Sequence, residues 1–239
     1  MRPRICVPLP IERLSDLSSL IRRAQDAGAD FIEVRLDFLQ EDILGQMNVL
    51  EKEIADASVP LIATNREHRQ GGKKVQEEKK RVEILIKAAE IGFEYVDVEL
   101  STRDLKQAIN RIVNLGSKPV ISYHNFKNTP SEVEMEKIVK SQIEAGASVC
   151  KLVTTANTIE DGIRCLLFTY KMSRVTDIVC FAMGRQGTIS RILSPIFGAL
   201  FTFSSLEQGL ETGSGQTSIF ELKEFYKKLG VFYDCYRKN

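Results

Sequence analysis

The sequence predicts an α/β protein built as a single (β/α)8 barrel, and two observations lead to this fold. Short apolar segments start roughly 20–35 residues apart, with helical patterns between them, a spacing that suits a strand followed by a crossover helix. A phrase that ends a helix and opens a strand also recurs, as AGADFIEVRL at 27–36, IGFEYVDVEL at 91–100 and AGASVCKLV at 145–153. Glycine readily adopts the left-handed conformation that closes a helix, so Gly28, Gly92 and Gly146 are predicted to end helices.

Eight segments have the composition of strands. They lie at 4–7, 31–36, 60–64, 94–99, 119–123, 148–153, 177–182 and 199–203. Most are apolar on both faces, which is typical of strands that are covered on both sides. Eight such units fit an eight-stranded parallel barrel in a chain of 239 residues, and an open doubly wound sheet is the alternative. We find no linker and no shift in composition, so we expect one catalytic domain over residues 1–239.

Helical patterns fill the intervals between these strands. The segment 11–27 carries the apolar stripe Leu14, Leu17, Ile21 and Ala24, and the segment 157–170 carries Ile159, Ile163, Leu166, Leu167 and Tyr170 on one face. Capping boxes are predicted for Ser131 with Glu134, Asn157 with Glu160 and Ser101 with Asp104.

The composition bounds the kinds of partner that the chain can have. The net charge of +1 gives no indication of a nucleic-acid surface, and no apolar run approaches the length of a membrane span. The first residues lack a long apolar run and a cleavage site, so we expect a cytoplasmic protein. Five widely spaced cysteines and two histidines argue against a zinc site, and we interpret the cysteines as reduced core residues.

Ionisable residues gather near the ends of the predicted strands, where the active site of a parallel barrel lies. Glu33, Arg35 and Asp37 alternate along EVRLD and therefore face the same way. Arg66 follows the third strand, Asp97 and Glu99 end the fourth, and His124 ends the fifth. Charged side chains on one face of a barrel strand are costly to bury unless they pair or bind something.

Lys151 lies inside the apolar strand VCKLV, where lysine is rare. The ordinary interpretation is a lysine that reaches outward or pairs with a carboxylate. The functional interpretation is a nucleophilic amine, with its pKa lowered by burial and by Arg35 and Arg66, that forms an imine with a carbonyl substrate. His124, 27 residues earlier, would lie on the adjacent strand as an acid or base beside that amine.

With these residues, the chain resembles the class I 3-dehydroquinate dehydratases over essentially its whole length. The matching stretches are EVRLD at 33–37, TNR with QGG within 64–72, SYHNF at 122–126, KLV at 151–153, MGRQGTISR at 183–191, FGALFTF at 197–203 and GQ at 215–216. The resemblance implies a barrel enzyme without metal or organic cofactor, and a homodimer. Its substrate would be 3-dehydroquinate, dehydrated to 3-dehydroshikimate in the shikimate pathway.

The resemblance also implies roles for individual residues. Lys151 would form the Schiff base and His124 would act as general acid and base. Arg191 would hold the substrate carboxylate. Further substrate contacts are implied for Glu33, Arg35, Arg66, Thr212 and Gln216.

Two positions depart from the family pattern. Many members have a glutamate before the Gly-Gly pair, which hydrogen-bonds the histidine, whereas this chain has Gln70. A neutral amide cannot stabilise an imidazolium as a carboxylate does, so we expect a lower pKa for His124, or Glu99 in the place of the missing carboxylate. The family's SAPGQ is TGSGQ at 212–216, where Thr212 keeps a hydroxyl.

Two other functions remain open on the sequence. A Schiff-base aldolase-like barrel would share the lysine, and Arg191 with the GSGQ turn would then bind a phosphate. A non-catalytic barrel used for binding is the second alternative, and the presence of Lys151, His124 and Arg191 together argues against it.

Overall fold

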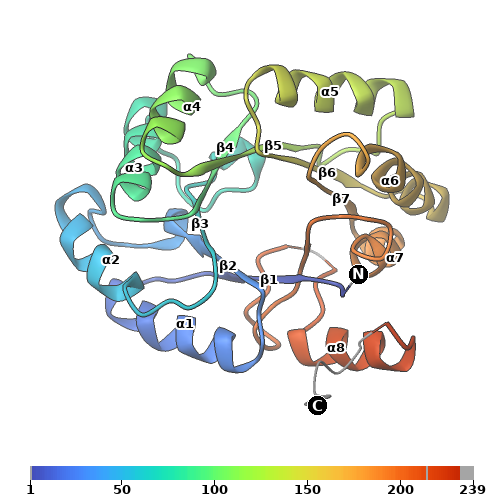
Figure 1. Cartoon of the computed structure of the whole chain (residues 1–239), viewed down its shortest axis with the longest axis horizontal. Coiled ribbons are helices and arrows are strands. Elements are labelled where there is room, and N and C mark those ends of the chain that lie inside the picture. Colours follow the sequence, from blue (N-terminus) through green and yellow to red (C-terminus); the bar gives the residue numbers. More distant parts are fainter. Residues whose placement is uncertain (1, 214, 232–239) are drawn as a thin grey trace, which may run out of the picture.

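In the computed structural model, strands and helices alternate along the chain as a (β/α)8 barrel (Figure 1). The structure describes residues 2–213 and 215–231. The strands are β1 (Ile5–Leu9), β2 (Phe31–Arg35), β3 (Leu61–Thr64), β4 (Tyr95–Glu99), β5 (Lys118–His124), β6 (Val149–Thr155), β7 (Ile178–Met183) and β8 (Thr202–Phe203). The helices are α1 (Leu17–Asp26), α2 (Met47–Ile54), α3 (Glu78–Glu90), α4 (Leu105–Asn114), α5 (Glu132–Glu144), α6 (Ile159–Met172), α7 (Thr188–Leu193) and α8 (Ile219–Lys228).

All strand pairs are parallel, and the sheet order is β7-β6-β5-β4-β3-β2-β1-β8. The remaining gap, between β7 and β8, is crossed by a hydrogen bond of 2.8 Å from Leu200 N to Ile178 O. The carboxyl ends of the strands therefore meet at one opening of a nearly closed barrel, which we call the mouth.

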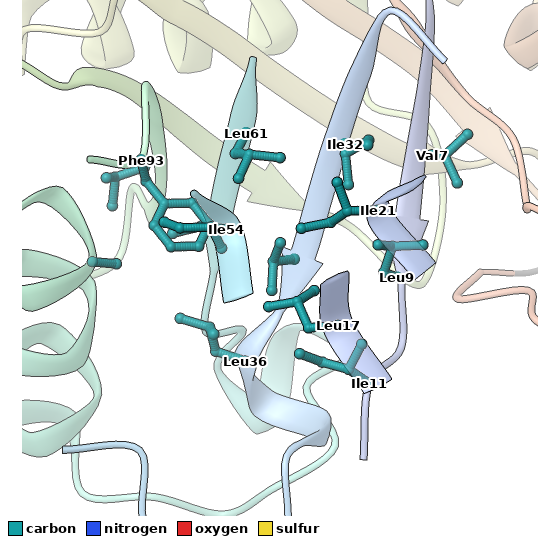
Figure 2. Packing of buried hydrophobic residues seen from close by; sticks show 14 of the residues in the cluster. Val7, Leu9, Ile11, Leu17, Ile21, Ile32, Leu36, Ile54, Leu61 and Phe93 are labelled. Carbon is teal, nitrogen blue, oxygen red and sulfur yellow. The ribbon is translucent and has the colours of Figure 1, made fainter. Parts of the chain in front are cut away.

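Apolar side chains pack on both sides of the sheet. Between the strands and the surrounding helices, Leu17 and Ile21 of α1 meet Val7 and Ile32 from β1 and β2 (Figure 2). A second cluster fills the barrel interior and contains Phe31, Tyr95, Phe181, Phe201 and Phe203 among others. Burial on both faces explains why the strands lack a polar and an apolar side, and it confirms that interpretation of the sequence.

The predicted strands are confirmed within two residues at each end for β1 to β7. The segment predicted at 199–203 pairs with β1 only at Thr202 and Phe203, and so is shorter than expected. Gly28, Gly92 and Gly146 have φ between 77° and 102°, which confirms them as left-handed residues after helices.

Four of the five residues in the apolar stripe predicted for the segment 157–170 face outward: Ile159, Ile163, Leu167 and Tyr170 are exposed, and only Leu166 is buried. The inner face of α6 also contains Gly162, Cys165 and Phe168, which are buried. Helical spacing identified the stripe correctly, but a second apolar face was available to cover the barrel.

One of the three predicted capping boxes is confirmed, at Ser131 with Glu134. The box before α6 is formed by Thr158 with Asp161, one residue later than the predicted Asn157 with Glu160. Ser101 does not cap α4, because Asp104 is the residue that precedes this helix. A hydroxyl followed three residues later by an acid fits more than one register, and here packing selects the register.

Four cysteines, Cys6, Cys150, Cys165 and Cys180, are buried and unpaired, as expected, and Cys235 lies outside the described residues. Over residues 2–213 and 215–231, no helix is long and apolar enough to cross a membrane. The same residues contain no cluster of histidine, cysteine and carboxylate side chains suited to a metal ion.

Candidate active site

A pocket of about 400 Å³ opens at the mouth of the barrel. It brings together all eight residues proposed from the sequence as site residues: Glu33, Arg35, Arg66, His124, Lys151, Arg191, Thr212 and Gln216. The parallel sheet explains this gathering: Arg35 and His124 end β2 and β5, and Glu33 and Lys151 lie inside β2 and β6.

The amine of Lys151 lies inside the pocket between two carboxylates. Its Nζ donates to Asp97 at 2.8 Å and to Glu33 at 3.1 Å, and the lysine side chain is only 5% exposed. Thr64 donates a further hydrogen bond to Glu33 at 2.9 Å and so fixes that carboxylate. The carboxylates favour a positive charge on the nitrogen, whether ammonium or iminium.

Arg66 extends this chain of charges away from Lys151. It donates to Asp97 at 2.6 Å and to Glu99 at 2.8 Å, and Arg81 of α3 binds the other oxygen of Glu99. Burial favours the protonated carboxyl, but Arg66 and Lys151 outweigh it and hold the pKa of Asp97 far below its usual range. Asp97 is therefore ionised and binds both cations.

Arg35 is also paired, with both of its contacting nitrogens on Asp37 at 2.8 and 2.9 Å. Asp37 lies in the turn after β2 and not on the strand, and it also accepts the backbone N–H groups of Arg66 and Lys73. Arg35 and Arg66 are thus each matched by carboxylates.

The loop of QGG holds Gln70 against His124. A Cβ on Gly72 would collide with the carbonyl oxygen of Arg66, and Gly71 has φ of 87°, so both glycines are required for this close turn. Gln70 Oε1 accepts from the backbone N–H of His124 at 3.2 Å and lies 3.4 Å from its Nδ1. Glu99 is engaged by the two arginines, so it does not replace the family glutamate beside His124.

This contact fixes the tautomer of His124. The backbone N–H can only donate, so the Gln70 atom that faces it is the amide oxygen, and the oxygen in turn requires a hydrogen on Nδ1. Nε2 is then the unprotonated nitrogen of the neutral ring. Burial, followed by the charges of Arg66 and Lys151, holds the pKa of His124 well below its ordinary value of 6.5, in the direction expected for a neutral neighbour at position 70.

Arg191 lies on α7 at the other side of the pocket. Burial lowers the pKa of its guanidinium to about 10, and an anionic ligand would oppose that shift. Thr212 and Gln216 are joined by two hydrogen bonds, from Thr212 N to Gln216 Oε1 at 2.8 Å and from Gln216 Nε2 to Thr212 Oγ1 at 3.3 Å. They line the same pocket as Arg191.

Several residues that build the site were not predicted from the sequence. Asp97 and Glu99 were noted at the end of a strand but given no contact with Lys151 or Arg66. Ser122, which donates to Asp97 at 2.6 Å, and Arg81, which lies on a helix, gave no signal of their own. Apolar lining was also missed, and it includes Phe126, Phe181, Met183 and Phe203.

The fold and the pocket together define a (β/α)8-barrel enzyme with a buried, charge-paired lysine at the mouth. Residues 5–232 match the model of the type I 3-dehydroquinase family, and the chain belongs to this family.

Two relatives and one solved structure extend this result. The 3-dehydroquinate dehydratase of Dehalococcoides mccartyi is 36% identical over 95% of this chain and 96% of its own length. That of Methanothermobacter thermautotrophicus is 34% identical over 92% and 94%. The type I 3-dehydroquinate dehydratase of Clostridium difficile, solved with covalently modified comenic acid, superposes with a TM-score of 0.87 at 28% identity, covering 95% of this chain and 92% of that one.

The first prediction concerns the neutral amide at position 70. In Gln70→Glu, a carboxylate accepts the Nδ1 hydrogen and stabilises the imidazolium, so the pKa of His124 rises from its depressed value. The ring shifts of His124, followed by NMR against pH, measure this change.

Gln70→Met is the matched control, because it removes the acceptor without adding charge and leaves the pKa of His124 low. If Gln70→Glu titrates like the wild type, the side chain at position 70 does not reach the ring, and the tautomer argument is wrong.

Proposed function

We propose that the chain catalyses the dehydration of 3-dehydroquinate to 3-dehydroshikimate, a step of the shikimate pathway towards aromatic amino acids, through an imine on Lys151. The observation that supports this most strongly is the lysine itself: a buried amine at the mouth of the barrel, 2.8 Å from Asp97 and 3.1 Å from Glu33. The family membership of residues 5–232 supports the substrate. The whole chain would serve as one catalytic unit.

The reaction begins when Lys151 condenses with the substrate ketone. The ketone oxygen leaves as water and an iminium takes its place. The iminium withdraws electrons, so the carbon next to it becomes acidic enough to lose a proton. Glu33 and Asp97 stabilise the positive nitrogen throughout, because they are already oriented towards it before the substrate binds.

His124 would move the protons. Its unprotonated Nε2 takes the proton from the carbon beside the iminium, which produces an enamine. The enamine then expels the hydroxyl on the next carbon, and the imidazolium protonates it as it departs. Both transfers by one side chain require the proton and the hydroxyl to leave from the same face of the ring, a syn elimination. Water finally hydrolyses the conjugated iminium and restores the amine.

The charge at the mouth suits an anionic substrate. Arg191 is buried in the pocket, and an anionic ligand would oppose the lowering of its pKa by burial. We assign the substrate carboxylate to Arg191, whose planar guanidinium can donate two parallel hydrogen bonds to a carboxylate. Glu33, Arg35, Arg66, Thr212 and Gln216 would contact the hydroxyl groups and the ring.

The second prediction tests the imine. Borohydride added during turnover of 3-dehydroquinate should inactivate the enzyme and leave substrate- or product-derived mass on the peptide that contains Lys151. Lys151→Arg keeps the positive charge between Glu33 and Asp97 but has no nucleophilic amine, so it should fold, form no adduct and lose turnover.

Mass spectrometry of the reduced peptides and a dehydration assay measure the outcome. A phosphorylated sugar, offered in place of 3-dehydroquinate, separates an aldolase-like activity from the proposed one. Label on another lysine, or turnover by Lys151→Arg, would exclude the mechanism.

The third prediction separates imine formation from proton transfer. His124→Ala leaves the amine of Lys151 in place but removes the proton carrier, so kcat should fall by about 10²–10⁴-fold. Covalent adducts should then accumulate and be visible in intact-protein mass spectra without reduction. Near-native turnover in this variant would assign the proton transfers to another group.

We also propose a cytoplasmic homodimer. The buried free thiols of the four described cysteines suit a reducing compartment. The exposed apolar stripe of α6, formed by Ile159, Ile163, Leu167 and Tyr170, supports a second copy of the chain as the partner, since an apolar stripe on a helix favours burial against another surface.

The fourth prediction follows from this stripe. Leu167 is 60% exposed, and Leu167→Glu should convert the dimer to a monomer that keeps its fold, as measured by sedimentation velocity. Val113→Glu places the same charge at an exposed position of α4 and should leave the dimer intact. A monomeric wild type, or a Leu167→Glu variant that remains dimeric, would contradict this interface.

A further inference from the structure

An aromatic floor lies beneath the pocket, formed by Phe31, Phe181, Phe201 and Phe203. Their rings contact one another: Phe181 and Phe203 have centroids 6.1 Å apart, Phe201 and Phe203 5.4 Å, and Phe31 and Phe201 4.7 Å. The two contacts of Phe203 are edge-to-face, with interplanar angles of 64° and 85°. The rings are buried in the barrel interior and are held by their neighbours.

Two cations of the pocket stand over this floor. Lys151 Nζ lies 4.4 Å from the ring centroid of Phe203, and the guanidinium carbon of Arg191 lies 4.3 Å from that of Phe181. The face of an aromatic ring carries partial negative charge and attracts a cation, most strongly where water is excluded. Lys151 and Phe203 are both buried, so the attraction between them is little screened by solvent.

The proposed chemistry changes how the lysine nitrogen can be stabilised. The ammonium and the ketone become an iminium and water: a C=N bond replaces the C=O bond, the oxygen leaves with two of the nitrogen's three hydrogens, and the positive charge stays on nitrogen. With one N–H left, the nitrogen can no longer donate separate hydrogen bonds to Glu33 and Asp97. The attraction to the ring face depends on the charge and not on N–H groups, so it persists.

We propose that Phe203 is a further catalytic residue, whose ring face stabilises the iminium cation on Lys151. The proposal rests on the imine mechanism above. Glu33 and Asp97 attract the same positive charge, but their hydrogen bonds to Nζ need N–H groups, whereas the attraction of the ring face does not.

The test uses phenylalanine analogues with one, two or three ring fluorines at position 203, introduced singly into the full chain. Fluorine withdraws negative charge from the ring face with little change in ring size. The expected result is a stepwise fall in kcat that reaches about threefold to tenfold with three fluorines. Phe203→Leu, which keeps an apolar side chain and removes the ring, should lower kcat at least as far.

The same analogues at position 201 are the matched control. Phe201 is buried in the same floor, and within the part of the chain that the structure describes no cation stands over its ring. Fluorination there should change kcat by less than about twofold. A kcat independent of fluorine number at position 203, or an equal fall at position 201, would overturn the role of Phe203.

Borohydride trapping of the wild type in the same series distinguishes a wrong role for Phe203 from a wrong proposed function. An adduct on Lys151, together with a flat fluorine series, rejects the role of Phe203 and leaves the imine mechanism in place. Absence of an adduct on Lys151 rejects both.

Discussion

The ion pairs of Asp97 are the interaction on which the mouth of this barrel depends. A buried carboxylate is costly unless it is paired and hydrogen-bonded, and here Lys151, Arg66 and Ser122 all donate to it, at 2.8, 2.6 and 2.6 Å. Removal of one charged partner would leave a buried charge unpaired, which commonly destabilises a protein by about 3–5 kcal/mol. The cluster therefore fixes the position of the lysine nitrogen before any substrate arrives.

The parallel sheet makes this cluster possible. Glu99 of β4 pairs in register with Ser122 of β5, and Ser122 pairs with Lys151 of β6, so three adjacent strands bring polar residues to the same level of the barrel. Asp97 lies two residues before Glu99 and therefore faces the same side of β4. Arg66 follows the end of β3, and Glu33 lies on β2, the next strands in the sheet. Arg81 reaches Glu99 from α3, and this contact ties the position of a surrounding helix to the charges of the mouth.

Much of this arrangement could be predicted from the sequence, because it follows from the strand period and the position of polar residues at strand ends. Glu33, Arg35 and His124 were found in this way, and Lys151 was found because lysine is rare inside an apolar strand. The pairing of Lys151 with Asp97 could not be predicted, since the sequence does not give the distance between side chains on different strands. Phe203 had no signal either, because a phenylalanine in a barrel strand is usually a core residue, and only the position of Lys151 above it gives the ring a second role.

The exposed stripe of α6 shows that the contacts of a helix are equally hard to predict from its sequence. Its spacing was read correctly, but two faces of this helix are apolar, and the sequence does not say which one meets the barrel. The capping box predicted at Ser101 was wrong for a related reason. Ser101 does not cap a helix but accepts a hydrogen bond of 2.7 Å from Gln70. Local patterns list the contacts that a residue can make, and the tertiary structure selects among them.

Gln70 and Phe203 affect two different steps of the proposed elimination: Gln70 contacts the proton carrier His124, and Phe203 contacts the nitrogen of Lys151. Burial and the charges of Arg66 and Lys151 lower the pKa of His124, and the neutral amide of Gln70 supplies no negative charge to oppose them. The ring is therefore a weaker base, and its conjugate acid is a stronger one. Protonation of the departing hydroxyl becomes easier, while removal of the proton from carbon becomes harder. The acidity of that carbon must then come from the iminium, whose positive charge Glu33, Asp97 and the ring of Phe203 stabilise. A chain with glutamine at position 70 therefore depends more on the environment of Lys151 than one with glutamate there.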